Sequence, residues 1–204
     1  MSRFFNLAVL QVRMGLELPG CPEIIRVQAL QDCLNTFCKE TEAWQEEMTA
    51  IDLVDGQLAY NLIPEFDVHV QRLIWVRVNT EEGVTAGTDG TTLRKEQYTL
   101  TPGDPDVLTL EDALEPVDDI TSGLTVKAVF VPEFNTMDVA EWFANRWWDA
   151  LRAGAMDICL RNPNKRWTNL DKANEYRMQF YKGIQEAKGE KRQNYKDGFV
   201  GMEA

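Results

Sequence analysis

Histidine is nearly absent from this sequence, since His69 is the only one among 204 residues. A Ser-His-Asp triad would have to use it as the general base. His69 stands between Val68 and Val70 in a segment typical of a β-strand, which favours a strand residue over a catalytic base. No phosphate-binding loop of the GxGxxG or GxxxxGK[ST] type occurs. We therefore expect no catalytic residue, no cofactor site and no enzymatic activity.

Paired-cysteine motifs are also missing. The cysteines Cys21, Cys33, Cys38 and Cys159 follow no CxxC or zinc-knuckle spacing, and one histidine cannot complete a zinc set. Cys33 and Cys159 fall in apolar helical stripes, where a free cysteine behaves as a small core residue. The sequence therefore predicts structural thiols and no metal site.

Long apolar runs are absent as well. No stretch of eighteen apolar residues occurs, so a transmembrane helix is not expected. The N-terminus has a short apolar patch but no small-residue cleavage site, and Arg13 and Glu17 follow soon after. We expect a protein made and kept in a reducing cytoplasm.

Positive charge is scarce: 21 Lys and Arg stand against 33 Asp and Glu, for a net charge of −12. So acidic a chain is not expected to bind duplex DNA, which requires cationic side chains to displace counterions. Residues 161–196 nevertheless contain ten Lys or Arg and four acidic residues, a net charge of +6, which leaves −18 for the remainder. A basic end and an acidic body can pack against a copy of the same chain or dock an acidic partner. A solvated helix face explains the basic end equally well.

The residues from Asp138 to Arg161 predict the helix around which the rest is organised. Apolar residues recur there at helical spacing in two neighbouring stripes. A helix that is apolar over most of its surface needs partners on more than one side, within the chain or on another subunit. The run Ala153-Gly154-Ala155 is expected to allow close helix packing. A glycine inside a helix costs about 0.5–1 kcal/mol against alanine and usually has a packing reason.

Two further helices are predicted. Pro22 stands where a first-turn proline helps a helix begin, and an apolar stripe continues to about Thr41. Residues 168–171 fit a capping box, and apolar residues then repeat at three and four residues up to Ala187. The short connection places this last helix antiparallel to the one before it. Residues 4–20 are compatible with either a short helix or an extended arm.

Between Ala43 and Phe134 the pattern changes from period 3.6 towards period 2, which predicts short strands. Asp55-Gly56 is expected to close a hairpin, and residues 102–105 another. The predicted fold class is therefore α+β, a helical bundle of three main helices with an inserted small antiparallel β-sheet or sandwich domain.

The predicted organisation has four parts. Residues 1–42 form an N-terminal arm and the first bundle helix, and residues 43–134 form the inserted β domain. Residues 135–190 form the two antiparallel bundle helices. Residues 191–204 lose the apolar pattern, which predicts a flexible tail that is disordered or orders on a partner.

Three groups of residues carry a resemblance. The first is Pro19-Gly20-Cys21-Pro22 leading into a helix that ends at residues 37–41, followed by Trp44. The second is the strand-turn-strand segment at residues 52–62. The third comprises Gly154-Ala155, Asn162-Pro163, Lys165-Arg166-Trp167, Asn169-Leu170, Ala173, Tyr176 and Phe180. Their order, over roughly residues 19–190, resembles that of bacteriophage head-to-tail adaptor proteins, also called head completion or portal-connector proteins. Residues 1–18 match nothing in this pattern.

The resemblance implies a structural virion protein without enzymatic activity. Such proteins form a homo-oligomeric ring, commonly of twelve subunits, beneath the portal, where they connect head to tail and extend the DNA channel. The implied partners are copies of the same chain, the portal protein, and tail or nozzle proteins. DNA passes through without specific binding, no membrane is involved, and the location is the neck of the virion after synthesis in the bacterial cytoplasm. An acidic wall would keep the genome from sticking to the channel.

The basic C-terminal end and the second apolar stripe supply the expected contacts with the portal or a neighbouring subunit. The candidates are Lys182, Lys188, Lys191, Arg192, Tyr195, Lys196 and Trp148. Two alternatives stay open. One is a tail-tube or tail-terminator ring subunit. The other, from a different class, is a carbohydrate-binding or cell-wall-acting module that uses the β domain and exposed tryptophans.

Overall fold

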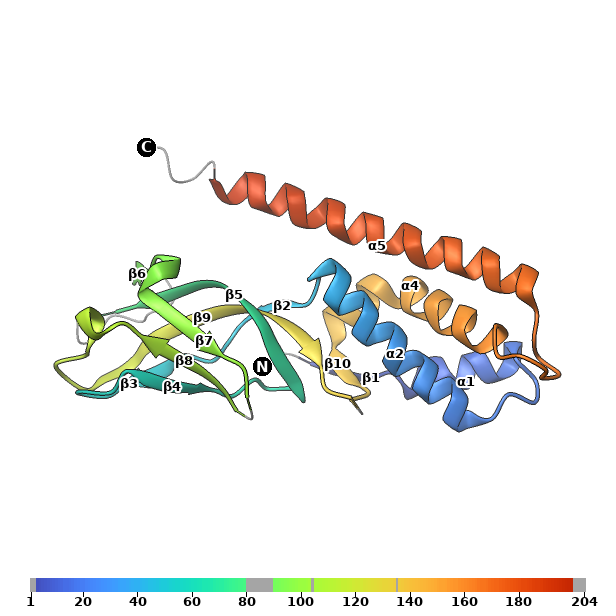
Figure 1. Cartoon of the computed structure of the whole chain (residues 1–204), viewed down its shortest axis with the longest axis horizontal. Helices are drawn as coiled ribbons and strands as arrows, with labels where there is room; N and C mark the ends of the chain where they lie inside the picture. Colours follow the sequence, from blue (N-terminus) through green and yellow to red (C-terminus); the bar gives the residue numbers. More distant parts are fainter. Residues whose placement is uncertain (1–2, 80–89, 104, 135, 200–204) are drawn as a thin grey trace. The chain divides into compact units, whose positions relative to one another are not determined.

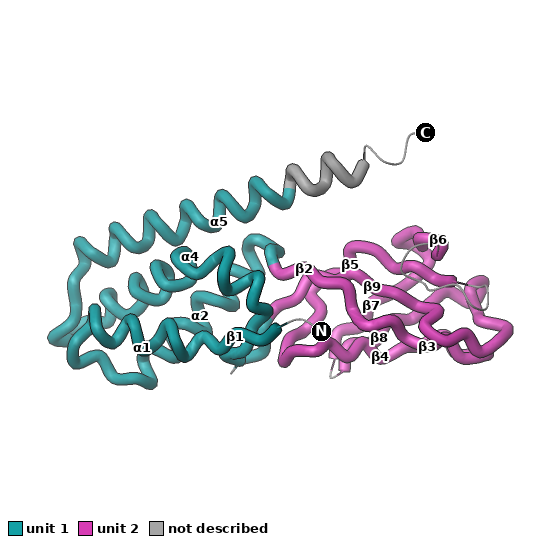
Figure 2. Tube along the Cα trace, turned by 180° about the vertical axis from the view of Figure 1, so that it is seen from behind, with its two compact units in different colours: residues 1–43, 132–204 teal, residues 44–131 magenta. Residues whose placement is uncertain are grey.

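The computed structural model describes residues 3–79, 90–103, 105–134 and 136–199, with only the backbone for residues 192–199. The chain divides into two compact units, which Figure 2 shows in different colours. Unit 1 comprises residues 1–43 and 132–204, and unit 2 comprises residues 44–131. The connections between the units therefore fall at Ala43–Trp44 and Val131–Pro132.

Unit 1 is built around helix α4 (Glu141–Leu160), which packs against α2 (Glu23–Thr41) and α5 (Leu170–Phe199) (Figure 1). Helix α1 (Ala8–Glu17) lies against α2. Strands β1 (Phe4–Asn6) and β10 (Asp138–Ala140) form an antiparallel pair. The aromatic centre of the core consists of Phe37, Phe143, Trp147 and Phe180.

The predicted bundle of three main helices with an inserted small β-sheet is wrong. The described part of unit 1 has four α-helices and a two-stranded sheet, and unit 2 is built of larger sheets. Helix α1 has apolar residues on both its buried and its exposed side, so its sequence shows no single amphipathic stripe. The segment Asp138–Ala140 also differs from the prediction, because it pairs with β1 and α4 begins only at Glu141.

Three helices approach closely at Gly154. A Cβ atom at Gly154 would overlap Cys33 Sγ of α2 and would lie 2.7 Å from Phe180 Cδ2 of α5. On the facing helix, a Cβ atom at Gly183 would lie 2.5 Å from Ala150 Cβ. Because these positions lack a side chain, α4 fits between α2 and α5 along its length.

Helix α5 continues to Phe199, beyond the end of its apolar pattern. The predicted flexible tail, residues 191–204, is thus helical in its backbone up to Phe199. The side chains of residues 192–199 and all of residues 200–204 lie outside the described part of the chain.

Unit 2 contains two sheets. The larger has the order β2-β9-β5-β6, with β3 also on β9, and the smaller has the order β4-β8-β7. The strands are β2 (Gln45–Glu47), β3 (Ile51–Leu53), β4 (Ala59–Leu62), β5 (Val68–Val78), β6 (Thr91–Thr92), β7 (Tyr98–Thr101), β8 (Asp106–Leu110) and β9 (Ile120–Pro132). Buried side chains from both sheets, among them Leu53, Tyr60, Val76, Leu108 and Leu124, form its core.

The two turns predicted from glycine and proline have different outcomes. Residues 102–105 connect β7 and β8, which pair antiparallel, so that hairpin is confirmed. Gly56 does lie in a turn, with a φ of 69°, but β3 pairs with β9 and β4 pairs with β8. The Asp55-Gly56 hairpin is therefore wrong, because the flanking strands belong to different sheets.

Asp106 holds one edge of unit 2 together. Its side chain is buried, with Oδ2 accepting the Val70 N–H at 2.6 Å and Oδ1 accepting the Gly103 N–H at 3.0 Å. Asp106→Ala would leave two amides without an acceptor, so we expect a loss of about 2–4 kcal/mol in the free energy of unfolding by urea. Asp106→Asn keeps one acceptor oxygen and should lose less. An equal loss for the exposed Asp118→Ala would contradict this assignment.

Candidate functional site

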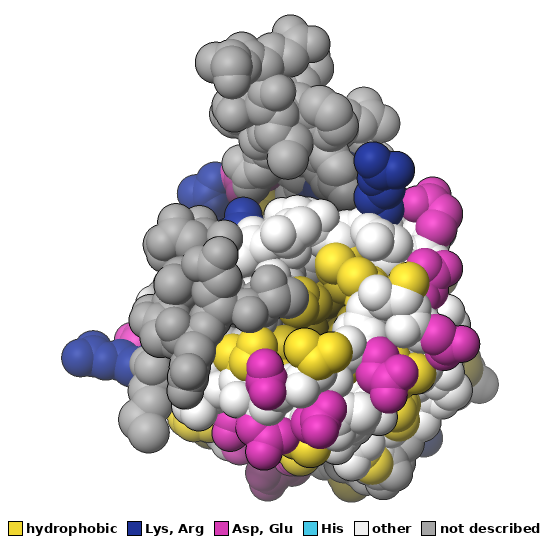
Figure 3. Space-filling view, turned by 90° about the vertical axis from the view of Figure 1, so that its left-hand side faces the viewer, with side chains coloured by type: hydrophobic (Ala, Val, Ile, Leu, Met, Phe, Trp, Pro, Cys, Tyr) yellow, Lys and Arg dark blue, Asp and Glu magenta, His cyan; other side chains and the backbone are white. Residues whose placement is uncertain are grey.

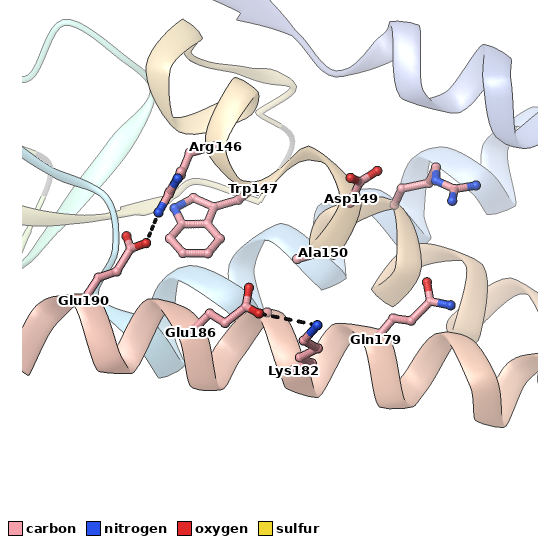
Figure 4. A pocket seen from close by; sticks show the side chains of 10 residues that line it. Arg146, Trp147, Asp149, Ala150, Gln179, Lys182, Glu186 and Glu190 are labelled. Atoms are coloured by element: carbon pink, nitrogen blue, oxygen red, sulfur yellow. Dashed lines mark hydrogen bonds and ion pairs between the residues drawn. The ribbon is translucent and has the colours of Figure 1, made fainter.

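A groove of about 550 Å³ runs between α4 and α5 (Figure 4). Its floor is apolar, formed by Trp147, Ala150 and Gly183, and polar side chains line its walls. These are Arg146, Asp149, Arg152, Gln179, Lys182, Glu186 and Glu190. Gly183 of α5 and Ala150 of α4 have little or no side chain, so the two helix backbones approach closely here and the groove is shallow.

The charges of the groove balance one another. Arg146 pairs with Glu190 across it, and Lys182 Nζ lies 3.7 Å from Glu186 Oε1 along α5. Hydrogen bonding to Glu190 raises the pKa of the Arg146 guanidinium. Three cationic and three anionic side chains line the groove, so it favours no ligand of one sign.

Two of the lysines predicted to contact a partner form ion pairs within the chain. Lys188 Nζ lies 3.1 Å from Glu40 Oε2, and Lys191 Nζ lies 2.6 Å from Glu42 Oε2. Both pairs join α5 to the C-terminal end of α2. Lys182 points instead into the groove, and the side chains of the candidates Arg192, Tyr195 and Lys196 lie outside the described residues.

Trp148 does not join these lysines. Its ring lies 5.5 Å from that of Phe5, edge to face, and the Arg13 guanidinium lies 5.3 Å above it. Such aromatic and cation–π contacts each contribute about 0.5–1.5 kcal/mol. Trp148 therefore fastens β1 and α1 to α4, and it is half-buried by them.

The four cysteines are buried, free thiols in unit 1. Burial raises the pKa of Cys33 and Cys38, and it raises the pKa of Cys159 to about 12. The Cys33 thiol donates to the Leu151 carbonyl oxygen at 3.3 Å. Such thiols are inert as nucleophiles. Among the residues that the structure describes, no group of three His, Cys, Asp or Glu side chains could hold a metal ion.

The sequence prediction missed a surface that we call the α1 stripe: Val9, Val12 and Leu16. These side chains are 50%, 62% and 83% exposed, whereas Leu10 and Met14 on the opposite side of α1 are buried. Val9, Val12 and Leu16 follow helical spacing in the sequence. Because a second set of apolar residues stands on the other side of the same helix, this pattern could have indicated an exposed apolar surface.

The charged residues of α1 are directed away from this stripe. Arg13 lies over the ring of Trp148. Glu17 accepts from Arg152 at 2.6 Å and from the Tyr176 hydroxyl at 2.9 Å. The side of α1 that carries Val9, Val12 and Leu16 is therefore apolar although it faces outward, whereas the outward side of an ordinary surface helix is polar.

The net charge belongs to unit 2. Residues 44–131 contain 17 Asp and Glu against five Lys and Arg, which equals the whole net charge of −12. Unit 1 contains 16 residues of each sign. The basic end predicted at residues 161–196 is thus balanced by acidic residues elsewhere in its own unit.

Neither a family model nor a curated protein matches this chain. In the part of the chain that the structure describes, no helix is long and apolar enough to cross a membrane.

Proposed function

We propose that this chain is a ring-forming structural subunit of the bacteriophage neck, a head-to-tail adaptor beneath the portal that extends the DNA channel. Its function is contact, without a reaction to catalyse. Its partners are copies of itself, the portal protein and tail components. The α1 stripe is the observation that carries this proposal.

The α1 stripe supports self-assembly because its exposure is costly. Complete burial of a Val or Leu side chain contributes about 1.5–3 kcal/mol. Contiguous exposed apolar side chains on a helix mark interaction surfaces more often than isolated ones do. Ile24, at the start of α2, is another exposed apolar side chain of this unit.

A ring needs two different contact surfaces on each subunit, because a heterologous contact repeats around an axis. The outward side of α5 supplies a second apolar surface, with Met178 and Tyr181 both exposed. The α1 stripe of one copy and this side of α5 on the next copy are of matching chemistry. Burying both at once removes two apolar surfaces from water.

The division of charge supports a channel role. An acidic unit 2 repels the DNA phosphates over about a Debye length, roughly 8–10 Å at physiological salt, so it would not hold the genome. Unit 1, with no net charge, suits close contact between identical copies, which a strong charge of one sign would oppose.

The test replaces the α1 stripe. We expect the full chain to sediment as large oligomers, and Val12→Ser with Leu16→Ser to shift it to monomer at the same concentration without lowering Tm. The matched control is Ile63→Ser, an equally apolar and exposed position in unit 2. A wild-type protein that stays monomeric at every concentration, with or without portal rings, would overturn the proposal.

The same assembly assay separates the alternatives. Co-sedimentation with portal rings but not with tail tubes supports the adaptor, and the reverse supports a tail-tube or terminator subunit. Glycan titration with quenching of tryptophan fluorescence would support a carbohydrate-binding module instead.

A further inference from the structure

Unit 2 has an apolar hollow at the end where the turn after β3 lies (Figure 3). We use the name tip hollow for the apolar side chains of the two joined loops at this end, one after β3 and one after β8: Val54, Leu58, Leu114 and Val117. Val54 and Val117 are 42% and 82% exposed, and the two leucines are half-buried. Figure 3 shows hydrophobic side chains in a hollow on this face, with Asp and Glu side chains below it and to its right.

The two loops that form the tip hollow are fastened to each other. The Gly56 N–H donates to the Pro116 carbonyl oxygen at 3.0 Å, and the Asp55 N–H donates to Asp119 Oδ1 at 2.9 Å. The surface is therefore formed in advance, so a partner would not have to order it.

The charged side chains of the two loops that form the tip hollow are all acidic. These six exposed carboxylates, which form its acidic rim, are Asp55, Glu111, Asp112, Glu115, Asp118 and Asp119. No Lys or Arg occurs in residues 54–58 or 111–119, and within the described residues none of the six forms an ion pair. A partner must therefore bring an apolar side chain surrounded by cations.

Unit 1 presents that chemistry at the turn between α4 and α5. We call this surface the basic corner: Lys165, Arg166, Leu170 and Lys172. Leu170 is 57% exposed, the three cations are exposed, and no ion pair in the described residues uses them. Asp171 is the single acidic residue of residues 161–172.

The basic corner is also rigid. The Lys165 N–H donates to Thr168 Oγ1 at 3.1 Å, and the Thr168 hydroxyl donates to the Asn162 carbonyl oxygen. Asn169 Oδ1 accepts the Lys172 N–H at 3.0 Å and caps the start of α5. The backbone that carries Leu170 and the neighbouring cations is therefore held in a defined conformation.

We propose that the tip hollow of one copy receives the basic corner of a second copy. Leu170 enters the hollow, and the three cations face the acidic rim. The inference rests on the self-association in the proposed function and names one of its contacts. Because each copy carries both surfaces, the contact is heterologous and can repeat from copy to copy.

The experiment reverses charge on each surface of the full chain. The tip variant is Asp112→Lys with Asp118→Lys, and the corner variant is Lys165→Glu with Arg166→Glu. We expect each variant alone to associate at least tenfold more weakly than wild type at about 50 mM salt, with a smaller difference at about 500 mM. The matched control, Glu47→Lys with Glu65→Lys, makes the same charge change elsewhere on unit 2 and should associate like wild type.

Mixing the variants gives the sharper readout. The basic corner of the tip variant and the acidic rim of the corner variant are both unaltered, so these two surfaces can still form the wild-type contact. We therefore expect the mixture to associate more strongly than either variant does alone.

The outcomes separate this inference from the proposed function. A wild-type chain that never associates overturns both. Association of wild type that neither double reversal weakens more than the control does overturns the inference alone. A tip variant that still self-associates but no longer sediments with portal rings also overturns it, because the hollow would then receive the portal.

Discussion

Gly154→Leu is expected to lower the free energy of unfolding by about 3 kcal/mol, at the upper end of the usual cost of overpacking a core. The new side chain would start from a Cβ atom that already overlaps Cys33 Sγ and crowds Phe180. Both neighbours belong to other helices, so relief requires α2 or α5 to move away from α4. At roughly 2–4 °C per kcal/mol for a chain of this size, Tm should fall by about 6–12 °C.

The matched control is a helical glycine in open space. No atom lies within 4 Å of a Cβ atom at Gly189 of α5, so Gly189→Ala should raise the free energy of unfolding by about 0.5–1 kcal/mol. Gly183→Ala, which would crowd Ala150 Cβ, should lower it. A Tm for Gly154→Leu equal to wild type would show that the close approach of the three helices is not needed.

The predicted close packing at Gly154 illustrates what sequence can and cannot specify. A glycine between two alanines in an apolar helix indicates a close neighbour, because nothing else compensates for its conformational cost. The spacing does not say which neighbour. Cys33, about 120 residues earlier in the chain, is placed there by tertiary packing that no local pattern encodes.

The spacing of apolar residues predicts the structure poorly in two segments, α1 and β10, where apolar residues do not form the single core-facing stripe of a helix. In α1, Leu10 and Met14 face the core while Val12 and Leu16 face outward, so the single stripe expected of a surface helix does not occur. In the sequence Val139 continues the apolar stripe of α4, yet it lies in β10 and pairs with Phe5. Pairing between segments so distant in sequence overrides a local helical pattern.

The charge pattern of the sequence does not distinguish cations that pair within the fold from cations that remain available to a partner. A cluster of cations at the C-terminal end predicts docking, but Lys188 and Lys191 pair with Glu40 and Glu42 of α2. Sequence alone cannot say which cations have partners inside the fold. The basic corner could be separated from the rest of the cluster only after those pairs were known.

Raising the pH should destabilise unit 1 well before unit 2. All four cysteines lie in unit 1, and burial raises the pKa of Cys21, Cys33, Cys38 and Cys159 above the ordinary thiol value. A raised pKa in the folded state means that the neutral thiol is favoured by folding. That contribution is present below the unfolded pKa of about 8.5 and is lost as the pH rises towards the folded value.

The magnitude follows for Cys159, whose folded pKa is about 12. Between pH 8.5 and pH 12 the unfolded chain loses this proton and the folded chain keeps it, so stability falls by about 1.4 kcal/mol per pH unit. By pH 10 this single thiol should have cost about 2 kcal/mol. The measurement is urea unfolding at pH 8, 9 and 10, followed by tryptophan fluorescence.

The slope of the free energy of unfolding against pH shows whether ionisation of Cys159 causes the loss. Packing that is lost in a Cys159 variant lowers stability equally at every pH and leaves this slope unchanged. Cys159→Ala lowers stability at every pH but should make the slope between pH 9 and pH 10 shallower by about 1.4 kcal/mol per pH unit. Residues 44–131 contain no cysteine. Unit 2 should therefore lose stability mainly above about pH 10, where tyrosine ionises in the unfolded chain while burial raises the pKa of Tyr60 in the folded chain. An unchanged slope in Cys159→Ala would mean that this thiol ionises equally in both states.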